Sequence, residues 1–177
     1  MQTAHELFIY ELADMLDAER RLVDALGEQA ETAANPQLRK LFSSHQAQTE
    51  KHVQRLEQVF EQFGDQPEQR ECKGMKGLLD EASEFKDERP SPDVLDTFTI
   101  GAAMKVESYE TDAYESLIRL AKYMNHTKAI KLLQQNLKEE QDAWKKLDGL
   151  AKKVKPERTG HETEEEEEPR RGRRRAA

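Results

Sequence analysis

The chain of 177 residues contains one cysteine, Cys72, so no disulfide bond can form within it. Such sparing use of cysteine is typical of proteins in a reducing, cytoplasmic compartment. No apolar run approaches the roughly 20 residues that a membrane-spanning helix needs. The N-terminal segment carries acidic residues where a secretion signal needs basic ones. We therefore expect a soluble cytoplasmic protein with no part in a membrane.

Aromatic residues make up only 6% of the chain, and it has only 8 glycines and 6 prolines. There is no glycine-rich phosphate loop, no strained turn around a nucleophilic serine and no pair of cysteines at zinc-binding spacing. The commonest enzyme classes that carry such motifs are thereby excluded. Charged residues, in contrast, reach 36%, against about 25% in average proteins. A charge-rich sequence with few turn-forming residues favours long, solvent-facing helices.

The formal net charge of −8 argues against nucleic-acid binding by the folded body of the protein. The C-terminal segment differs, because a run of glutamates at 164–168 is followed by five arginines between Arg170 and Arg175. With too little apolar content to form a core, residues 156–177 are predicted to be a disordered charged tail. Its arginines would bind nucleic acid only weakly, since the adjacent glutamates neutralise them. We expect one domain, residues 1–155, ahead of this tail.

Four long segments carry apolar residues at alternating steps of three and four, the spacing that forms one stripe along an α-helix. These helices are predicted over residues 3–31, 36–63, 92–124 and 127–154. Their stripes place Tyr114 of the third helix, and Leu137 and Trp144 of the fourth, in the core. The connection at 64–93 is long, and its own apolar spacing predicts one short amphipathic helix. No segment alternates as a strand does. Two helices, a long crossover and two further helices are the order of ferritin-like bundles. We therefore predict an all-α, ferritin-like antiparallel four-helix bundle with a crossover that carries a short extra helix.

Each long helix has polar residues in its apolar stripe near its midpoint. The interrupting residues are Glu19 in the first helix, His45, Thr49 and His52 in the second, Glu107 and Glu110 in the third and Glu140 in the fourth. Gln48 lies one position to the side of this series. Because the midpoints of antiparallel helices lie at the same level, we expect these side chains to converge in one buried layer.

A layer of this composition is unfavourable by itself, because a bare buried carboxylate costs several kcal/mol and neighbouring carboxylates repel one another. A single Glu or His in a helix stripe more often sets register or forms a hydrogen bond than binds a metal. Four such interruptions at matched depth favour bound cations instead. Carboxylate oxygen and imidazole nitrogen suit iron or manganese, with zinc as the alternative. The candidate ligands are Glu19, Glu107 and Glu140 first, then His52 and Glu110, with His45 and Gln48 as ligands or as partners of ligands.

The sequence around these residues resembles a known family. The stretches that carry the resemblance are LADMLDAERRLVDAL around Glu19, FSSHQAQTEKHVQRLEQVF, GAAMKVESYETDAYESL around Glu107 and KAIKLLQQNLKEEQDAWKKL around Glu140. Over nearly all of residues 1–154 the chain is similar to the YciE/YciF family of ferritin-like bacterial stress proteins. The resemblance implies a dinuclear metal centre, a homodimer and a role in the stress response. It places Glu19, Glu107 and Glu140 at the family's carboxylate positions and His52 at a ligand position.

Two functions follow from these patterns. The first is a metal-dependent oxidoreductase or metal-storing protein that acts on peroxide, O2 or iron. The second is a non-enzymatic helical dimer or interaction protein, whose buried polar layer fixes the register of the helices and binds no metal. The second is motivated by the absence of the Glu-x-x-His spacing of ferritin-like sites, since Ala143 follows Glu140 by three residues.

Overall fold

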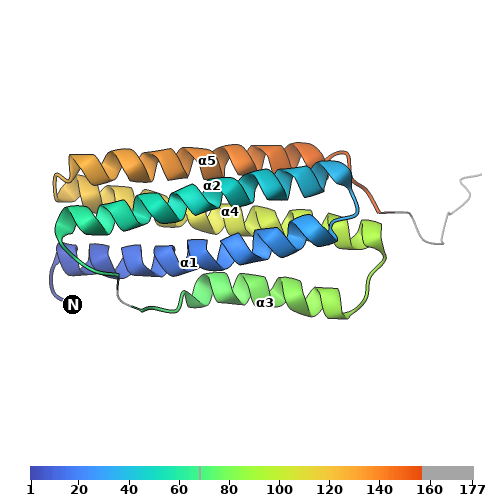
Figure 1. Cartoon of the computed structure of the whole chain (residues 1–177), viewed down its shortest axis with the longest axis horizontal. Coiled ribbons are helices and arrows are strands. Elements are labelled where there is room, and N and C mark those ends of the chain that lie inside the picture. The colour runs from blue at the N-terminus through green and yellow to red at the C-terminus, as the bar shows by residue number, and fades with distance from the viewer. Residues whose placement is uncertain (68, 157–177) are drawn as a thin grey trace, which may run out of the picture.

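The chain folds into five α-helices, and the described residues contain no strand (Figure 1). The computed structural model describes residues 1–67 and 69–156, so the predicted disordered tail lies outside the described residues apart from its first position. The helices are α1 (Ala4–Thr32), α2 (Pro36–Phe63), α3 (Lys73–Asp87), α4 (Pro92–Tyr123) and α5 (Thr127–Ala151). The predicted all-α class is confirmed, and α3 is the short helix expected in the crossover. None of the described helices combines the length and the apolar content needed to cross a membrane.

Local chemistry sets where the helices begin and end. The Thr3 hydroxyl accepts a hydrogen bond from the backbone N–H of Glu6, whose carboxylate accepts one from the Thr3 N–H, so a capping box begins α1. The side chain of Asn35 caps α2, with proline in its first turn. Gly64 ends α2 in the left-handed conformation at φ 70°, which costs glycine little because it has no Cβ.

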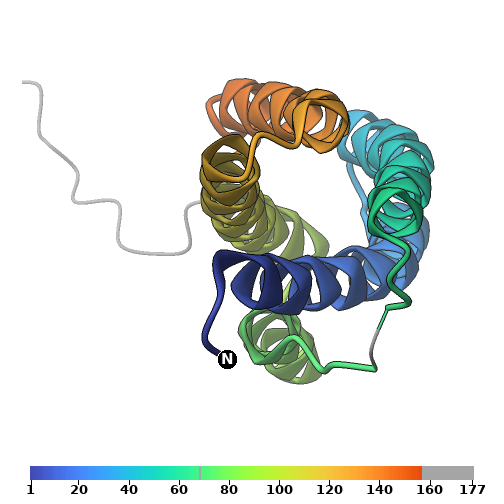
Figure 2. The same ribbon diagram turned by 90° about the vertical axis from the view of Figure 1, so that its left-hand side faces the viewer.

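The four long helices form a square bundle in the order α1, α2, α5, α4, as the view along its axis shows (Figure 2). Successive helices around the square run in opposite directions. The chain leaves α2 at one end of the bundle and begins α4 at the other, so the crossover must return along the length of the bundle (Figure 1). It does so on the outside, where α3 packs against α1 and α4. No other described element covers the opposite side of the bundle, between α2 and α5.

Two apolar clusters fill the bundle, one on either side of its middle. Toward the N-terminal end of α1 the core includes Phe8, Leu12, Val59, Leu117 and Leu133. Toward the C-terminal end of α1 the core residues include Leu22, Leu26, Phe42, Ile100 and Leu147. The interrupting polar residues lie between these clusters, so apolar side chains shield the layer from both ends.

The buried stripe of α5 differs from the predicted one. We expected Leu137 and Trp144 in the core, but both are only partly buried, and Asn136 and Ala143 take the buried positions. A helix stripe allows a step of three or of four, so the spacing alone left these positions open. The structure places the small Ala143 beside the polar layer and leaves the large indole of Trp144 at the margin of the bundle.

Asp96, in the second turn of α4, is a buried acid that the stripe analysis did not single out. Its exposed fraction is 3%, and its carboxylate accepts hydrogen bonds from the backbone N–H groups of Ala34 and Asn35, at 3.0 and 2.7 Å. These groups belong to the turn between α1 and α2, so Asp96 joins the two helical hairpins.

We expect Asp96→Ala to lower the free energy of unfolding by about 2 kcal/mol, because two charge-assisted, part-buried hydrogen bonds from the turn between α1 and α2 are lost. Urea denaturation measures this value. The exposed Asp112 on the same helix supplies the control, since Asp112→Ala should change stability by less than about 0.5 kcal/mol. Equal effects of the two substitutions would contradict the role given to Asp96.

Candidate metal centre

The bundle brings six of the seven predicted site residues together in one buried layer. They are Glu19 from α1, His45 and His52 from α2, Glu107 and Glu110 from α4 and Glu140 from α5. None of these side chains is more than 3% exposed. The spacing explains the convergence, because residues three or seven positions apart share one helix face. Each helix therefore turns its polar residues inward at the same height.

The six residues form two groups with ligand geometry that share Glu140. One group consists of His45, Glu107, Glu110 and Glu140, and the other of Glu19, His52 and Glu140. Within each group, one ligand atom per residue lies within 4.8 Å of the others. Atoms on opposite sides of a cation bound at about 2.2 Å are about 4.4 Å apart. Both groups are therefore compact enough to surround one cation, although the nearest pair, His52 Nδ1 and Glu140 Oε1 at 2.6 Å, would have to move apart slightly to admit it.

His52 is oriented as metal-bound histidines usually are. Its Nδ1 lies 2.6 Å from Glu140 Oε1 and 3.4 Å from Glu19 Oε1, on the side where a cation would bind. Its Nε2 hydrogen-bonds to Glu139 Oε2 at 2.9 Å, and Glu139 is itself held by the guanidinium of Arg55 at 3.0 and 3.1 Å. A carboxylate on the far ring nitrogen fixes the tautomer and the ring orientation of a ligating histidine.

His45 presents its Nε2 to the other group, 3.0 Å from Glu107 Oε1 and 3.4 Å from Glu140 Oε2. These contacts lack hydrogen-bond alignment, and neither ring nitrogen has a hydrogen-bond partner. Burial lowers the pKa of His45 despite the nearby charge of Glu140, so the ring is neutral and free to donate a lone pair.

The layer leaves many buried polar atoms unsatisfied. Twelve buried side-chain nitrogen or oxygen atoms in the described part of the chain lack a hydrogen-bond partner, and nine of them belong to these six residues. Both oxygens of Glu110 and both of Glu140 are among them. Buried polar groups are almost always paired, so this concentration points to a missing partner that accepts electron pairs. The donor set of oxygen and imidazole nitrogen fits a divalent cation.

The electrostatics of the layer agree with that interpretation. Burial raises the pKa of Glu107 to about 8, and burial together with the charge of Glu140 raises the pKa of Glu110 well above its usual value. Burial alone would lower the pKa of His52, but the charges of Glu19 and Glu140 raise it to about 11. Without a cation, the site therefore holds protons at neutral pH to reduce its negative charge.

A hydrogen-bond network supports Glu19 from behind. The hydroxyl of Tyr114 donates to Glu19 Oε1 and accepts a bond from Asn136 Nδ2 at 2.8 Å. Asn136 Oδ1 in turn accepts one from Arg55 at 2.8 Å, so Arg55 supports both Glu19 and, through Glu139, His52. We expected Tyr114 in the core and assigned no role to Asn136, Arg55 or Glu139. The position of Asn136, four residues before Glu140 on the same helix face, is the signal that could have identified it.

Gln48 and Cys72 stand apart from the six. Gln48 is partly buried and lies beside His45 on α2, outside both ligand groups. Cys72 is buried at the start of α3, where its Sγ lies 3.0 Å from the Tyr109 hydroxyl and its N–H bonds to Asp17 at 2.8 Å. These contacts hold the start of α3 against α1 and α4, so Cys72 has a structural role.

The fold and the buried layer define a ferritin-like helical-bundle protein whose core could hold a metal ion. The chain belongs to the family described as a domain of unknown function, DUF892, which matches residues 3–160. It is 36% identical to Protein YciF of Escherichia coli (strain K12) over 152 residues, which cover 85% of this chain and 92% of that protein. The predicted membership of the YciE/YciF family is confirmed.

Solved structures of two relatives share the fold. The crystal structure of YciF, described as an E. coli stress protein, superposes with a TM-score of 0.84 at 35% identity and covers 87% of this chain and 98% of that one. The structure of YcfI from Rhodopseudomonas palustris gives a TM-score of 0.81 at 35% identity, covering 84% of this chain and 94% of that one.

Proposed function

We propose that the protein binds two divalent metal ions, iron or manganese, and uses them to act on peroxide, O2 or iron under stress. One ion is held by His45, Glu107, Glu110 and Glu140, and the other by Glu19, His52 and Glu140. The concentration of unsatisfied buried ligand atoms carries the proposal. Two redox-active ions this close together would supply the two electrons that reduction of a peroxide O–O bond requires.

The protein's own residues provide the setting for that chemistry. Glu140 holds the two ion positions together, while Tyr114 and Glu139 fix the orientations of Glu19 and His52. The apolar clusters above and below the layer keep water from the ends of the bundle. The buried carboxylic acids can take up or release protons when the charge of the centre changes.

The test is metal content per chain after purification without chelators and reconstitution with Fe(II), Mn(II) or Zn(II). We expect two ions in the wild-type protein and one in each of His45→Ala and His52→Ala, because each histidine belongs to one group only. The exposed His5 provides the control, and His5→Ala should keep both ions. A wild-type protein that stays free of metal under ample supply would overturn the proposal.

Metal binding should release protons and tighten with rising pH. The raised pKa of Glu107, about 8, and the raised pKa of Glu110 mean that the metal-free site is protonated at pH 7. A cation must displace these protons, so affinity should increase from pH 6 to pH 8. Calorimetric titration in buffers of different ionisation enthalpy measures the released protons. Binding that is independent of pH over this range would show that these carboxyl groups are not ligands.

The second candidate function is a metal-free interaction protein, which the lack of a histidine at Ala143 favours. Metal content alone distinguishes the two candidates.

We further propose a homodimer, which the family resemblance supports, and a cytoplasmic location, which the sparing use of cysteine supports. Sedimentation at micromolar concentration tests the dimer.

A further inference from the structure

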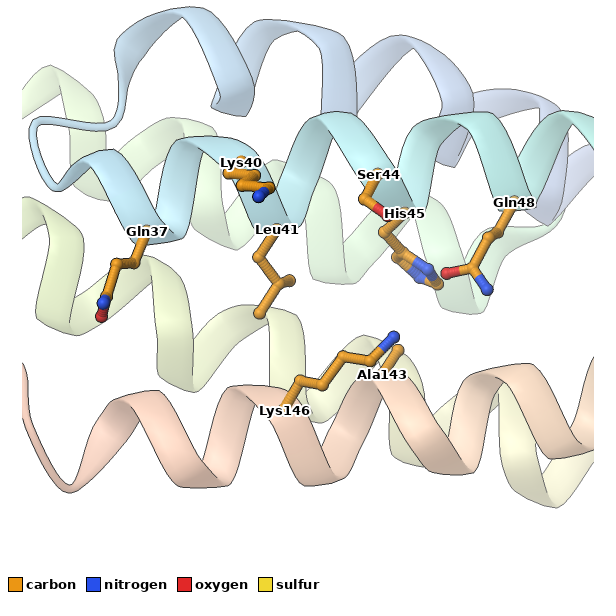
Figure 3. Close-up of a pocket in the computed structure, with 8 residues that line it drawn as sticks. All are labelled: Gln37, Lys40, Leu41, Ser44, His45, Gln48, Ala143 and Lys146. Carbon is orange, nitrogen blue, oxygen red and sulfur yellow. The ribbon is translucent and has the colours of Figure 1, made fainter.

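A pocket of about 260 Å³ leads from the surface to the metal layer between α2 and α5 (Figure 3). This is the side of the bundle that α3 does not cover. The pocket reaches His45, whose side chain points from α2 toward α5, and Ala143 lines the opposite wall. Its volume, at about 30 Å³ per water molecule, is enough for an anion of a few atoms together with water.

The small side chain of Ala143 contributes room to the pocket. In ferritin-like sites a Glu-x-x-His pair projects inward from one helix, and the position three residues after Glu140 is occupied here by Ala143. The methyl group of Ala143 leaves the room that an imidazole would fill. His45 supplies a nitrogen from the opposite helix instead, which leaves the space beside it open.

The fully charged side chains that line the pocket are all positive. The lining includes Lys40 and Lys146 and no carboxylate, although acidic residues outnumber basic ones in the chain by 36 to 28. Both lysines are exposed, and neither forms an ion pair within the described residues, whereas the neighbouring Lys145 pairs with Asp142 at 3.3 Å. The charge of Lys146 also acts on the buried carboxyl group of Glu107, where it opposes the raising of the pKa by burial. Figure 3 shows the Lys146 side chain extended along α5 with its ammonium group directed toward the gap between His45 and Ala143.

His45 offers a second sign of a ligand. Its side chain is 3% exposed, it lines the pocket, and its Nδ1 has no hydrogen-bond partner. Gln48 lies next to it with its amide facing the same space and can donate a further hydrogen bond (Figure 3). A buried imidazole, an amide and the ammonium group of an exposed lysine thus line one small pocket.

We propose that this pocket binds a small monoanion, of the class of azide, formate or hydroperoxide, against the His45 side of the metal centre, with Lys146 as its cationic partner. The inference rests on the proposed metal centre and extends it by naming the chemistry of the ligand and its route.

The experiment uses the full chain loaded with Co(II), whose visible absorption reports changes in coordination without any turnover. Cobalt stoichiometry is measured first, and azide is then titrated. We expect a saturable spectral change in the wild-type protein. Lys146→Gln should raise the azide dissociation constant about fivefold, as for a partly exposed ion pair, and Lys146→Arg should restore most of the affinity.

Two further variants test whether azide binds in this pocket. Ala143→Leu fills the pocket and should abolish the azide response, and Leu41→Trp, which narrows the opening, is the second blocking variant should leucine at 143 disturb cobalt binding. The matched control is Lys145→Gln, because Lys145 is an exposed neighbour on α5 that lies outside the pocket.

The possible failures are distinguishable. A chain that takes up no cobalt overturns the metal proposal and this inference with it. A cobalt-loaded chain with the same azide affinity in the wild type, in Lys146→Gln and in both blocking variants overturns this inference alone.

Discussion

Replacing Glu140 with alanine is expected to weaken the binding of both metal ions and to raise the dissociation constant of each at least about 100-fold. Substitutions of residues that only orient ligands typically cost 10- to 100-fold in affinity, and Glu140 is itself common to both ligand groups. Wild-type protein at a metal concentration of 100 times the dissociation constant should gain about 2.7 kcal/mol against unfolding for each occupied site, or about 5.4 kcal/mol for two. With each affinity reduced 100-fold, the variant should gain no more than about 0.4 kcal/mol per site at the same metal concentration. Thermal unfolding with and without metal measures the difference.

Glu140→Gln separates ligation from packing, because glutamine keeps the shape of the side chain and removes its charge. It should fold as well as the wild type and still lose both ions. Glu115→Ala, an exposed change on α4, serves as the control and should keep the full metal-induced stabilisation. Retention of one ion at wild-type affinity in Glu140→Gln would show that Glu140 is not shared.

Glu110→Met is expected to make the metal-free protein more stable, by about 1–3 kcal/mol, and the metal-loaded protein less stable than wild type. Glu110 is fully buried, and neither of its oxygens has a hydrogen-bond partner. Burying such a polar group without a partner costs about 1–3 kcal/mol, and methionine has a similar length without that cost. For a protein of this size, 1 kcal/mol corresponds to about 2–4 °C in Tm.

The opposite effects of Glu110→Met on stability without and with metal are the informative result, since most core substitutions destabilise a protein under all conditions. Glu110→Gln is the matched control, because its amide stays unsatisfied and should bring no gain without metal. A metal-free Glu110→Met protein that is clearly less stable than wild type would mean that Glu110 has a stabilising partner in the absence of a cation. Together with the loss of both ions from Glu140→Ala, the inversion would distinguish a metal site from a polar layer that only sets helix register.

The sequence determined the helices and the polar layer through short-range rules. A hydrophobic period near 3.6 identifies the inward face of a helix from residues a few positions apart. The capping box at Thr3, the cap at Asn35 and Gly64 mark helix ends through contacts within one turn. Glu19, Glu107 and Glu140 each lie near the midpoint of a helix. Predicting that they share one layer then required only that antiparallel helices of similar length lie side by side. The choice between Ala143 and Trp144 could not be made this way, because the helix period allows both.

Tertiary structure alone decided which side chains meet. The sharing of Glu140, the contact of His52 with Glu139 and the links from Arg55 and Tyr114 join residues more than 20 positions apart. The same holds for the pocket at Lys146, which depends on α3 packing on α1 and α4 and leaving the α2–α5 side uncovered. Local periodicity determines whether a side chain faces the core, whereas the residues that it contacts there depend on how the helices rotate and slide against one another.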